Sequence, residues 1–563
     1  MSITAEHILA VARRCGVQHL WMTTGSDLTS FQEAAARCSR DGVPVPKILT
    51  APHEHVGLTA AIGETMWDGR AAMTAVHADL GVLHQGGAIH NALIGRSPVL
   101  TLSGYPPVSE AQRRHAVYWY QQRWDPGMTI RQYSRWDYRL SPLDDPCVVT
   151  ERAIQVALSQ PTGPTHLIVP DEVARLDRPT GELERHLSRS AVVPASLGVA
   201  PEDACGLLAE RILASQLPVI VTDRAGTEPG VVALLSEFAK DFGIPVVAGR
   251  HRLNLPDTHP ALVGPSVLED ADCVILLDSP VPWIPGRNGP RPGVWTAALG
   301  PDPLVRDVPV WEFAVDLGLQ VDVLRTLPVL HEALMSRIRG VPEHQSASAA
   351  RMRRAAEQHP VPISVHGTGP VLTEGDIAHA LSDLLDPEDL LVTEVFDTSA
   401  VLREIPGTLY EKGASSLGWA QAAAMGLRVA AGDRPTTCVT GDGSYMFGSP
   451  TAALWAQQDL DRPILTVVVV NGGYRTGSTT LAAHYPEGAA VSAGDYRGGL
   501  LDPSPRLAAQ AQAAGGHGAV ITDRTVLRSE LRRARQRVEQ DRVPAVVEVV
   551  VERHRDRLPS AKA

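Results

Sequence analysis

Short, almost uninterrupted apolar runs rich in β-branched residues recur along the whole chain, and helical patterns separate them. Strands that are apolar on both faces belong in parallel sheets covered by helices, because parallel strands are joined by helical crossovers. The sequence therefore predicts an α/β fold built from doubly wound parallel sheets. The clearest runs are AAMTAVHA (71–78), PTHLIVP (164–170), CVILLDS (273–279), TTCVTG (436–441) and PILTVVVV (463–470).

Two polar, proline-containing stretches, residues 177–203 and 340–370, interrupt this alternation and are typical of linkers. A chain of 563 residues is long enough for three or four domains of about 150 residues. We therefore expect three domains, each with its own sheet, at residues 1–185, 195–345 and 365–555.

Composition and charge narrow the class of protein. The chain is 44% hydrophobic and 20% charged, which is typical of a globular protein, and its net charge is −12. An acidic balance argues against nucleic-acid and membrane-surface partners. No apolar run is long enough to span a bilayer, and the first residues lack the features of a signal peptide. We expect a cytoplasmic protein whose six cysteines are buried free thiols.

Two predicted strands end on oxygen ligands beside glycines. The strand at 436–440 is followed by Gly441-Asp442-Gly443, and the strand at 463–470 by Asn471-Gly472-Gly473. Ligands bind at the carboxyl ends of strands in open α/β sheets, so Asp442 and Asn471 can converge. Two oxygen ligands suit Mg²⁺, which takes its other ligands from water and from phosphate. The glycines allow backbone N–H groups to approach that phosphate.

The segment between these two strands predicts a helix over 449–458, with Ser449 as its N-cap and Pro450 as its first residue. The loop is not a Walker motif, and Met446 occupies the third glycine position of a GxGxxG fingerprint. From spacing alone, a tight strand-to-helix turn with a capping aspartate is an equal alternative to a phosphate site.

The GDG motif and four further segments resemble the family of thiamine-diphosphate-dependent enzymes. The GDG motif, followed by an asparagine after the next strand, is similar to the signature of that family. The other matches are APHEHVGLTAAIG (51–63), HADLGVLHQGGAIHNALIGRSPVLTLSG (77–104), GPTHLIVPDE (163–172) and KGASSLGWAQAAAMG (412–426).

This resemblance implies an N-terminal pyrimidine-binding domain, a central domain and a C-terminal diphosphate-binding domain. It also implies thiamine diphosphate and Mg²⁺ as cofactors. The expected assembly is a homodimer or homotetramer, with each active site between the N-terminal domain of one subunit and the C-terminal domain of its neighbour.

The resemblance also assigns roles to residues. Glu54 matches the glutamate that activates the cofactor by facing its aminopyrimidine ring. Leu417 matches the apolar residue between the two cofactor rings, and the backbone around Ser415 should contact the aminopyrimidine.

The remaining cofactor residues follow from the C-terminal motif. Asp442 and Asn471 would bind the metal through their side chains, and Gly473 through its carbonyl. The other expected cofactor-binding residues are Gly441, Gly443, Ser444, Tyr474, Thr398 and Ser399.

The loops that face the substrate depart from the family pattern. The usual GPG turn is Asp79-Leu80-Gly81, and His84 follows where the family has an asparagine. His77 and Ser26 match the active-site histidine and serine of benzoylformate decarboxylase. A histidine at this place can move protons during catalysis, so we include both residues in the predicted catalytic set.

The resemblance implies non-oxidative decarboxylation of a small-molecule 2-oxo acid through an enamine intermediate. A carboligase resembling acetolactate synthase is the first alternative, and a catalytically silent structural or regulatory member is the second. Aromatic residues in the segment 118–138 are mild evidence for an apolar or aromatic substrate, and they are equally consistent with interface packing. The central segment has no glycine-rich dinucleotide fingerprint, so we expect no FAD.

Overall fold

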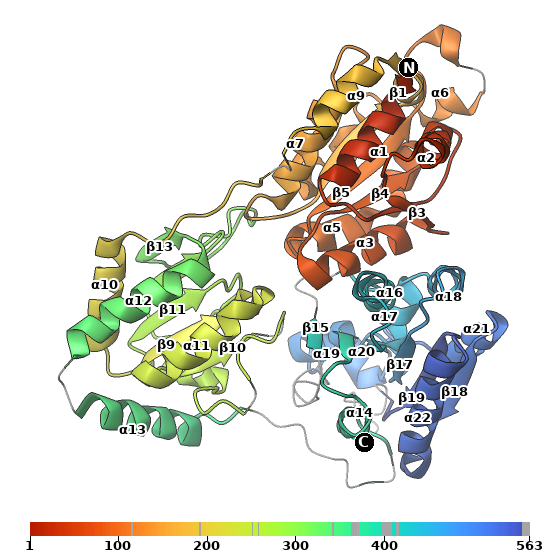
Figure 1. The fold of residues 1–563 in the computed structure, drawn as a ribbon. Helices are drawn as coiled ribbons and strands as arrows, with labels where there is room; N and C mark the ends of the chain where they lie inside the picture. Colours follow the sequence, from red (N-terminus) through yellow and green to blue (C-terminus); the bar gives the residue numbers. More distant parts are fainter. Residues whose placement is uncertain are drawn as a thin grey trace.

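The computed structural model contains three separate parallel sheets, so the predicted α/β class is confirmed (Figure 1). The predicted domain boundaries stay predictions. A small antiparallel pair joins β1 (Ser2–Ile3) to β8 (Asp177–Arg178). The structure describes residues 1–113, 116–190, 193–249, 251–256, 258–339, 343–361, 369, 371–395, 408–411 and 416–553.

The first sheet has six parallel strands in the order β3-β2-β4-β5-β7-β6. Its core includes the buried residues Ile8, Phe31 and Leu102. The strands are β2 (His19–Met22), β3 (Lys47–Thr50), β4 (Ala72–Val76), β5 (Val99–Tyr105), β6 (Trp136–Arg139) and β7 (Thr165–Pro170). The helices are α1 (Thr4–Arg14), α2 (Thr29–Asp41), α3 (Glu54–Asp68), α4 (Ala78–His84), α5 (Gly86–Ile94), α6 (Val117–Gln121), α7 (Pro146–Leu158), α8 (Asp171–Ala174) and α9 (Thr180–Leu187).

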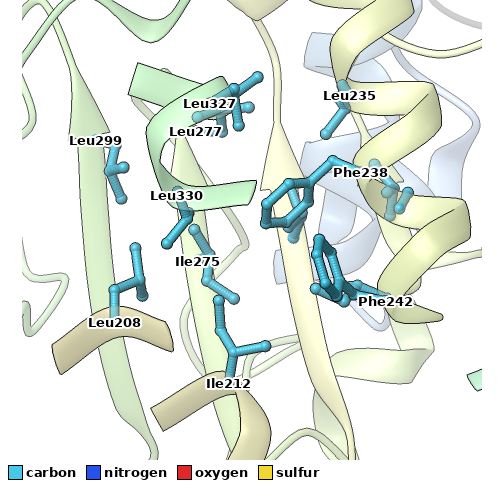
Figure 2. Close-up of a cluster of buried hydrophobic side chains, with 14 of the residues drawn as sticks. Leu208, Ile212, Leu235, Phe238, Phe242, Ile275, Leu277, Leu299, Leu327 and Leu330 are labelled. Atoms are coloured by element: carbon cyan, nitrogen blue, oxygen red, sulfur yellow. The ribbon is translucent and has the colours of Figure 1, made fainter. Parts of the chain in front are cut away.

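The central sheet has five parallel strands in the order β10-β9-β11-β12-β13. Phe238 and Phe242 pack edge to face against each other in its core, with ring centroids 5.0 Å apart (Figure 2). The strands are β9 (Pro218–Thr222), β10 (Val246–Ala248), β11 (Cys273–Leu277), β12 (Trp295–Gly300) and β13 (Leu317–Gln320). The helices are α10 (Glu202–Ala214), α11 (Pro229–Phe242), α12 (Val323–Ile338) and α13 (Glu343–Gln358).

The C-terminal sheet has six parallel strands in the order β15-β14-β16-β17-β19-β18. The strands are β14 (Leu390–Glu394), β15 (Thr408–Glu411), β16 (Thr436–Gly441), β17 (Leu465–Val470), β18 (His517–Ile521) and β19 (Ala545–Val550). The helices are α14 (Glu374–Ser382), α16 (Ala420–Ala431), α17 (Asp442–Phe447), α18 (Pro450–Asp459), α19 (Arg475–His484), α20 (Ala489–Ala493), α21 (Leu507–Ala513) and α22 (Arg524–Gln540).

Both predicted linkers contain a helix. Helix α9 lies within 177–203, and its Leu183 is buried against Ala10, Val11 and Cys147. Helix α13 lies within 340–370. Proline-containing, polar sequence therefore marked the ends of these helices rather than a continuous linker.

The N-terminal and C-terminal parts of the chain pack directly together through α3 and α16 (Figure 1). Two glycines allow this close contact. A Cβ atom on Gly63 would lie 2.0 Å from the carbonyl oxygen of Ala423, and one on Gly426 would lie 1.9 Å from that of Ala60. The two helix backbones therefore touch, and a side chain at either glycine would force them apart.

Among the residues that the structure describes, no helix combines the length and the apolar character needed to cross a bilayer. The six cysteines carry free thiols, and all but the partly buried Cys15 are buried, as the sequence predicted.

Candidate functional site

The N-terminal end of α3 meets the segment that precedes α16. Glu54 is the first residue of α3, and the next residue, His55, donates from Nε2 to the Gly418 carbonyl at 3.3 Å. The Asn91 side chain donates to the Ser416 carbonyl at 3.0 Å and accepts from the Ser416 N–H at 3.1 Å. Both parts belong to one chain here, so the share of a second subunit in the site stays a prediction.

Glu394, which the sequence analysis missed, holds the start of α16. Its two carboxylate oxygens accept from the backbone N–H groups of Gly418, Trp419 and Ala420 at 2.8–3.0 Å. A carboxylate is favourable at this end of a helix because the N–H groups there have no partner within the helix. Glu394 is the last residue of a buried strand, β14, and this is the same signal that identified Asp442.

The Glu54 carboxyl lies among histidines. Its Oε2 is 3.1 Å from Nδ1 of His84, and its side chain is 13% exposed. The rings of His53 and His84 stack with centroids 5.5 Å apart. His53 precedes the helix and accepts the N–H of His55 on its ring. Glu54 is thus held at the junction with its carboxyl near the protein surface.

Asp442 ties together the loops after β16 and β17. Its carboxylate accepts from the N–H of Gly443 at 2.8 Å and from the N–H of Gly472 at 2.7 Å. The Asn471 side chain accepts from the N–H of Gly473 at 3.0 Å. The predicted convergence of the two strand ends is therefore present, and Gly472 has the left-handed backbone (φ 79°) that this turn requires.

Burial raises the pKa of Asp442 to about 6, although the backbone donors favour its ionised form. A cation beside this carboxylate would stabilise its charge. The oxygen atoms of Asp442 and Asn471 are hard ligands of the kind that Mg²⁺ prefers, and each has a further lone pair. The residues present therefore fit a magnesium ion.

The adjoining residues form a surface suited to a phosphate group. The Tyr474 ring lies against Gly443, where a Cβ atom would come within 2.5 Å of the ring. Gly443 and Ser444 belong to the first turn of α17, a helix that the sequence analysis did not predict, and Gly441 is its N-cap. Free N–H groups at a helix start favour an anion.

A second polar group lies at the carboxyl ends of β2 and β4. His77 follows β4, and its Nδ1 is 2.5 Å from Oδ1 of the buried Asp27. The other Asp27 oxygen accepts from the N–H of Ala78 at 3.0 Å. Gln121 approaches the second ring nitrogen of His77, with its Nε2 at 2.7 Å. Asp27 and Gln121 were not predicted, although Asp27 adjoins the predicted Ser26.

Close packing fixes this histidine–aspartate pair. A Cβ atom on Gly25 would lie 2.3 Å from Nδ1 of His77, and one on Gly104 would lie 2.0 Å from Oδ2 of Asp27. The hydrogen bond that His77 donates to Asp27 raises the pKa of His77, and the charges of Asp27, Asp79 and Glu54 act in the same direction against burial. Ser26 is exposed beside this pair.

The other predicted residues have mixed outcomes. Leu417 is half-buried between Ser416 and Gly418, and its place between the two cofactor rings stays a prediction. Thr398, Ser399 and Ser415 lie outside the described residues. The helix predicted over 449–458 is α18, but Ser449 makes no capping hydrogen bond with its side chain. Its backbone is left-handed (φ 50°), which turns the side chain away from the first N–H groups of the helix.

Family models match both ends of the chain. Residues 3–126 match the N-terminal TPP binding domain of thiamine pyrophosphate enzymes, and residues 397–549 match their C-terminal TPP binding domain. TPP is thiamine pyrophosphate, another name for thiamine diphosphate. The two predicted halves of the cofactor site thus fall within the two matched domains.

Individual relatives and solved structures agree with these matches. A benzoylformate decarboxylase of Pseudomonas aeruginosa is 26% identical over 75% of this chain and 78% of its own length. An acetolactate synthase large subunit of Mycobacterium tuberculosis is 23% identical over 96% of this chain and 95% of its own. The fold is similar to a 4-hydroxybenzoylformate decarboxylase of Rhodococcus jostii, with 19% identity, 98% and 99% coverage and a TM-score of 0.77.

Proposed function

The chain belongs to the thiamine pyrophosphate enzyme family, and we propose that it uses thiamine diphosphate and Mg²⁺ to decarboxylate a 2-oxo acid without oxidation. The observation that carries this proposal is the His77–Asp27 pair, because it supplies a positioned proton donor at the substrate end of the candidate site. The alternative of a silent family member loses support, since Glu54, Asp442 and Asn471 are all present at the site.

The C-terminal loops would hold the cofactor. Asp442 and Asn471 would bind Mg²⁺ by side chain and Gly473 by its carbonyl, so that the ion offsets the charge of the diphosphate. Gly441, Gly443 and Ser444 would face the diphosphate at the start of α17, with the ring of Tyr474 alongside.

At the junction, Glu54 would hold and move a proton at the aminopyrimidine ring, and Leu417 would separate the two rings. When bound, the cofactor would supply a carbon nucleophile for the 2-oxo group and an electron sink for the loss of CO₂. The hydrogen bond to His84 fixes the direction of the Glu54 carboxyl.

His77 would return a proton to the substrate-derived carbon after CO₂ has left. The raised pKa of His77 keeps its ring protonated to higher pH, which suits a general acid near neutrality. Asp27 accepts from Nδ1 of the ring. The Gln121 amide lies at the other ring nitrogen, and its oxygen must face that nitrogen when the ring is protonated, because an amide NH₂ cannot accept a hydrogen bond. The exposed Ser26 would contact the substrate carboxylate from the adjacent loop.

The segment around α6 favours an aromatic substrate. Gln121 is buried against His77, while Trp119 and Tyr120 of the same helix are more than half exposed. Large aromatic side chains beside the proton donor can pack against an aromatic ring. The same residues would also suit a contact between the subunits of a homodimer or homotetramer, which light scattering of the purified protein would test.

A carboligase reaction is the second candidate, because the acetolactate synthase relative aligns over nearly the whole chain. The deciding experiment incubates the protein with thiamine diphosphate, Mg²⁺ and a panel of aromatic and aliphatic 2-oxo acids, with and without an aldehyde acceptor. Release of aldehyde and CO₂ supports the decarboxylase, whereas a hydroxyketone formed only with acceptor supports the carboligase. If no acid gives an aldehyde or a hydroxyketone, both the decarboxylase and the carboligase proposals are contradicted.

A further inference from the structure

A second polar cluster lies in the N-terminal part of the chain, where α1, the start of α7 and the end of α9 come together. Asp145, Cys147 and His186 each place one ligand atom within 4.8 Å of the others. A fourth group, His7, has its Nδ1 3.5 Å from Sγ of Cys147. Among the described residues, this is the one cluster of metal-ligand type that includes a sulfur atom.

From this geometry we propose that Asp145, Cys147 and His186 bind a zinc ion. His7 lies beside the sulfur but farther from the other ligand atoms, and it would move in as the fourth ligand. Zinc prefers four sulfur, nitrogen and oxygen ligands in a tetrahedron. Bond lengths of about 2.0–2.3 Å place neighbouring ligand atoms about 3.3–3.7 Å apart. The Nδ1–Sγ distance at His7 and Cys147 lies in that range, and Oδ2 of Asp145 is 3.0 Å from Nε2 of His186.

Both histidines have a polar group beside the second ring nitrogen, but only His7 is hydrogen-bonded there. In such sites the ring nitrogen that does not bind the metal contacts a carboxylate, carbonyl or similar group. The second nitrogen of His7 is 2.8 Å from the Ser2 hydroxyl. The second nitrogen of His186 is 3.6 Å from a carboxylate oxygen of Glu151. The Ser2 contact orients the His7 ring, whereas Glu151 lies beside the second nitrogen of His186 without a hydrogen bond.

Asp145 has one oxygen that faces His186 and would exchange that hydrogen bond for the ion. Its Oδ1 caps α7 by accepting the N–H groups of Cys147 and Val148, and Oδ2 faces His186. Asp145 is exposed, whereas His7 and Cys147 are fully buried. An ion can therefore enter past the carboxylate and reach the buried sulfur.

The charges and protonation states are consistent with this arrangement. Burial lowers the pKa of His7 to about 4, so its ring is neutral and able to coordinate. Burial also raises the pKa of the Cys147 thiol to about 12, so ion binding must release this proton to solvent. The resulting thiolate and the Asp145 carboxylate together neutralise the two charges of Zn²⁺.

The proposed ion would fasten the start of the chain to α7 and α9. Helix α1 carries His7, α7 begins beside Asp145 and Cys147, and α9 carries His186 near its last turn. We expect a structural ion, because all four ligands come from the protein. This role is independent of the proposed catalytic reaction.

Cobalt(II) substitution of the full-length protein tests the proposal. The protein is treated with chelator, supplied with excess Mg²⁺ and titrated with Co²⁺, which gives a near-ultraviolet charge-transfer band when bound to thiolate. We expect one equivalent of this band, and one equivalent of Zn²⁺ should abolish it. The cluster of His53, Glu54 and His84 contains no sulfur and cannot produce the band.

Variants identify the ligands. Cys147→Ser should remove the band, whereas the matched control Cys205→Ser, another buried thiol, should keep it. His186→Gln retains the buried thiol and should weaken Zn²⁺ binding more than Glu151→Gln does. Loss of an outer partner such as Glu151 typically costs about 10- to 100-fold in affinity.

Two results would overturn the proposal. One is a parent protein without a thiolate–cobalt band, which would leave the cluster as a hydrogen-bond network alone. The other is an unchanged band in Cys147→Ser or His186→Gln. If Cys147→Ser does not fold, the parent and His186→Gln titrations still decide the matter.

Discussion

The loop around Asp442 and the group around His77 both lie at carboxyl ends of parallel strands, but different contacts hold them in place. Asp442 is held by backbone N–H groups, one of them on the residue that follows it. His77 is held by the side chains of Asp27 and Gln121, which are 50 and 44 residues away in sequence. A site made from backbone and a local motif can be recognised in sequence, whereas a site made from distant side chains appears only after folding.

The largest effect is expected from Asp442→Ala, which removes the centre of the backbone-held loop. The variant loses a proposed metal ligand and leaves the N–H groups of Gly443 and Gly472 without their acceptor. We expect no measurable retention of thiamine diphosphate in a calorimetric titration with Mg²⁺. Binding as tight as in the parent would show that the cofactor site is elsewhere.

Glu54→Gln tests the carboxyl group at the start of α3. The amide keeps the size of the side chain but cannot move the proton, so the cofactor should still bind. We expect hydrogen–deuterium exchange at C2 of the bound cofactor, followed by NMR, to slow by about 10²- to 10⁴-fold. Exchange at the parent rate would remove Glu54 from the mechanism.

His77→Ala removes the histidine that the Asp27 and Gln121 side chains hold in place. We expect cofactor affinity to be retained and turnover to fall by about 10²-fold or more, since general acid help is worth about 10²- to 10⁴-fold. His90→Ala, in α5, is the control and should have much less effect. Equal losses in both variants, together with lowered melting temperatures, would indicate a folding defect instead.

The fold was predictable because ten or so buried strands repeat one local pattern, and that pattern is also what a parallel sheet requires. The Asp442 loop was also predictable, because its glycine-flanked motif is local in the sequence. Asp27 and Gln121 were missed because their partners are remote in sequence, and nothing local distinguishes them from surface residues. Glu394 ends a buried strand, and that signal was overlooked. The left-handed Ser449 also could not be read from its residue type, which is common at ordinary helix starts.

The smallest effect is expected from Asp27→Asn, which alters only the contact between Asp27 and His77. The Asp27 hydrogen bond raises the pKa of His77, so the active protonated ring persists to higher pH in the parent. Turnover should fall as the pH rises through this pKa. In the variant that fall should begin about one to two pH units lower, since a charged hydrogen bond is worth about 1.5–3 kcal/mol.

A pH–rate profile with the true substrate measures this shift. Asp79→Asn is the matched control, because Asp79 raises the pKa of His77 by charge alone and should shift the profile less. A profile that does not move in Asp27→Asn would mean that His77 is not the group that titrates.

The backbone contact between α3 and α16 fixes the position of α3 along its axis, and with it the position of the proposed catalytic carboxyl of Glu54. Gly63 lies nine residues along the helix from Glu54, a distance of about 13.5 Å at 1.5 Å per residue. Because a helix transmits displacement along its axis, a methyl group added at Gly63 moves Glu54 relative to the cofactor loops. Substitutions at the contact between α3 and α16 would then reduce the turnover of an enzyme that is still folded and still binds its cofactor. Screens for improved variants must therefore leave Gly63 and Gly426 unchanged.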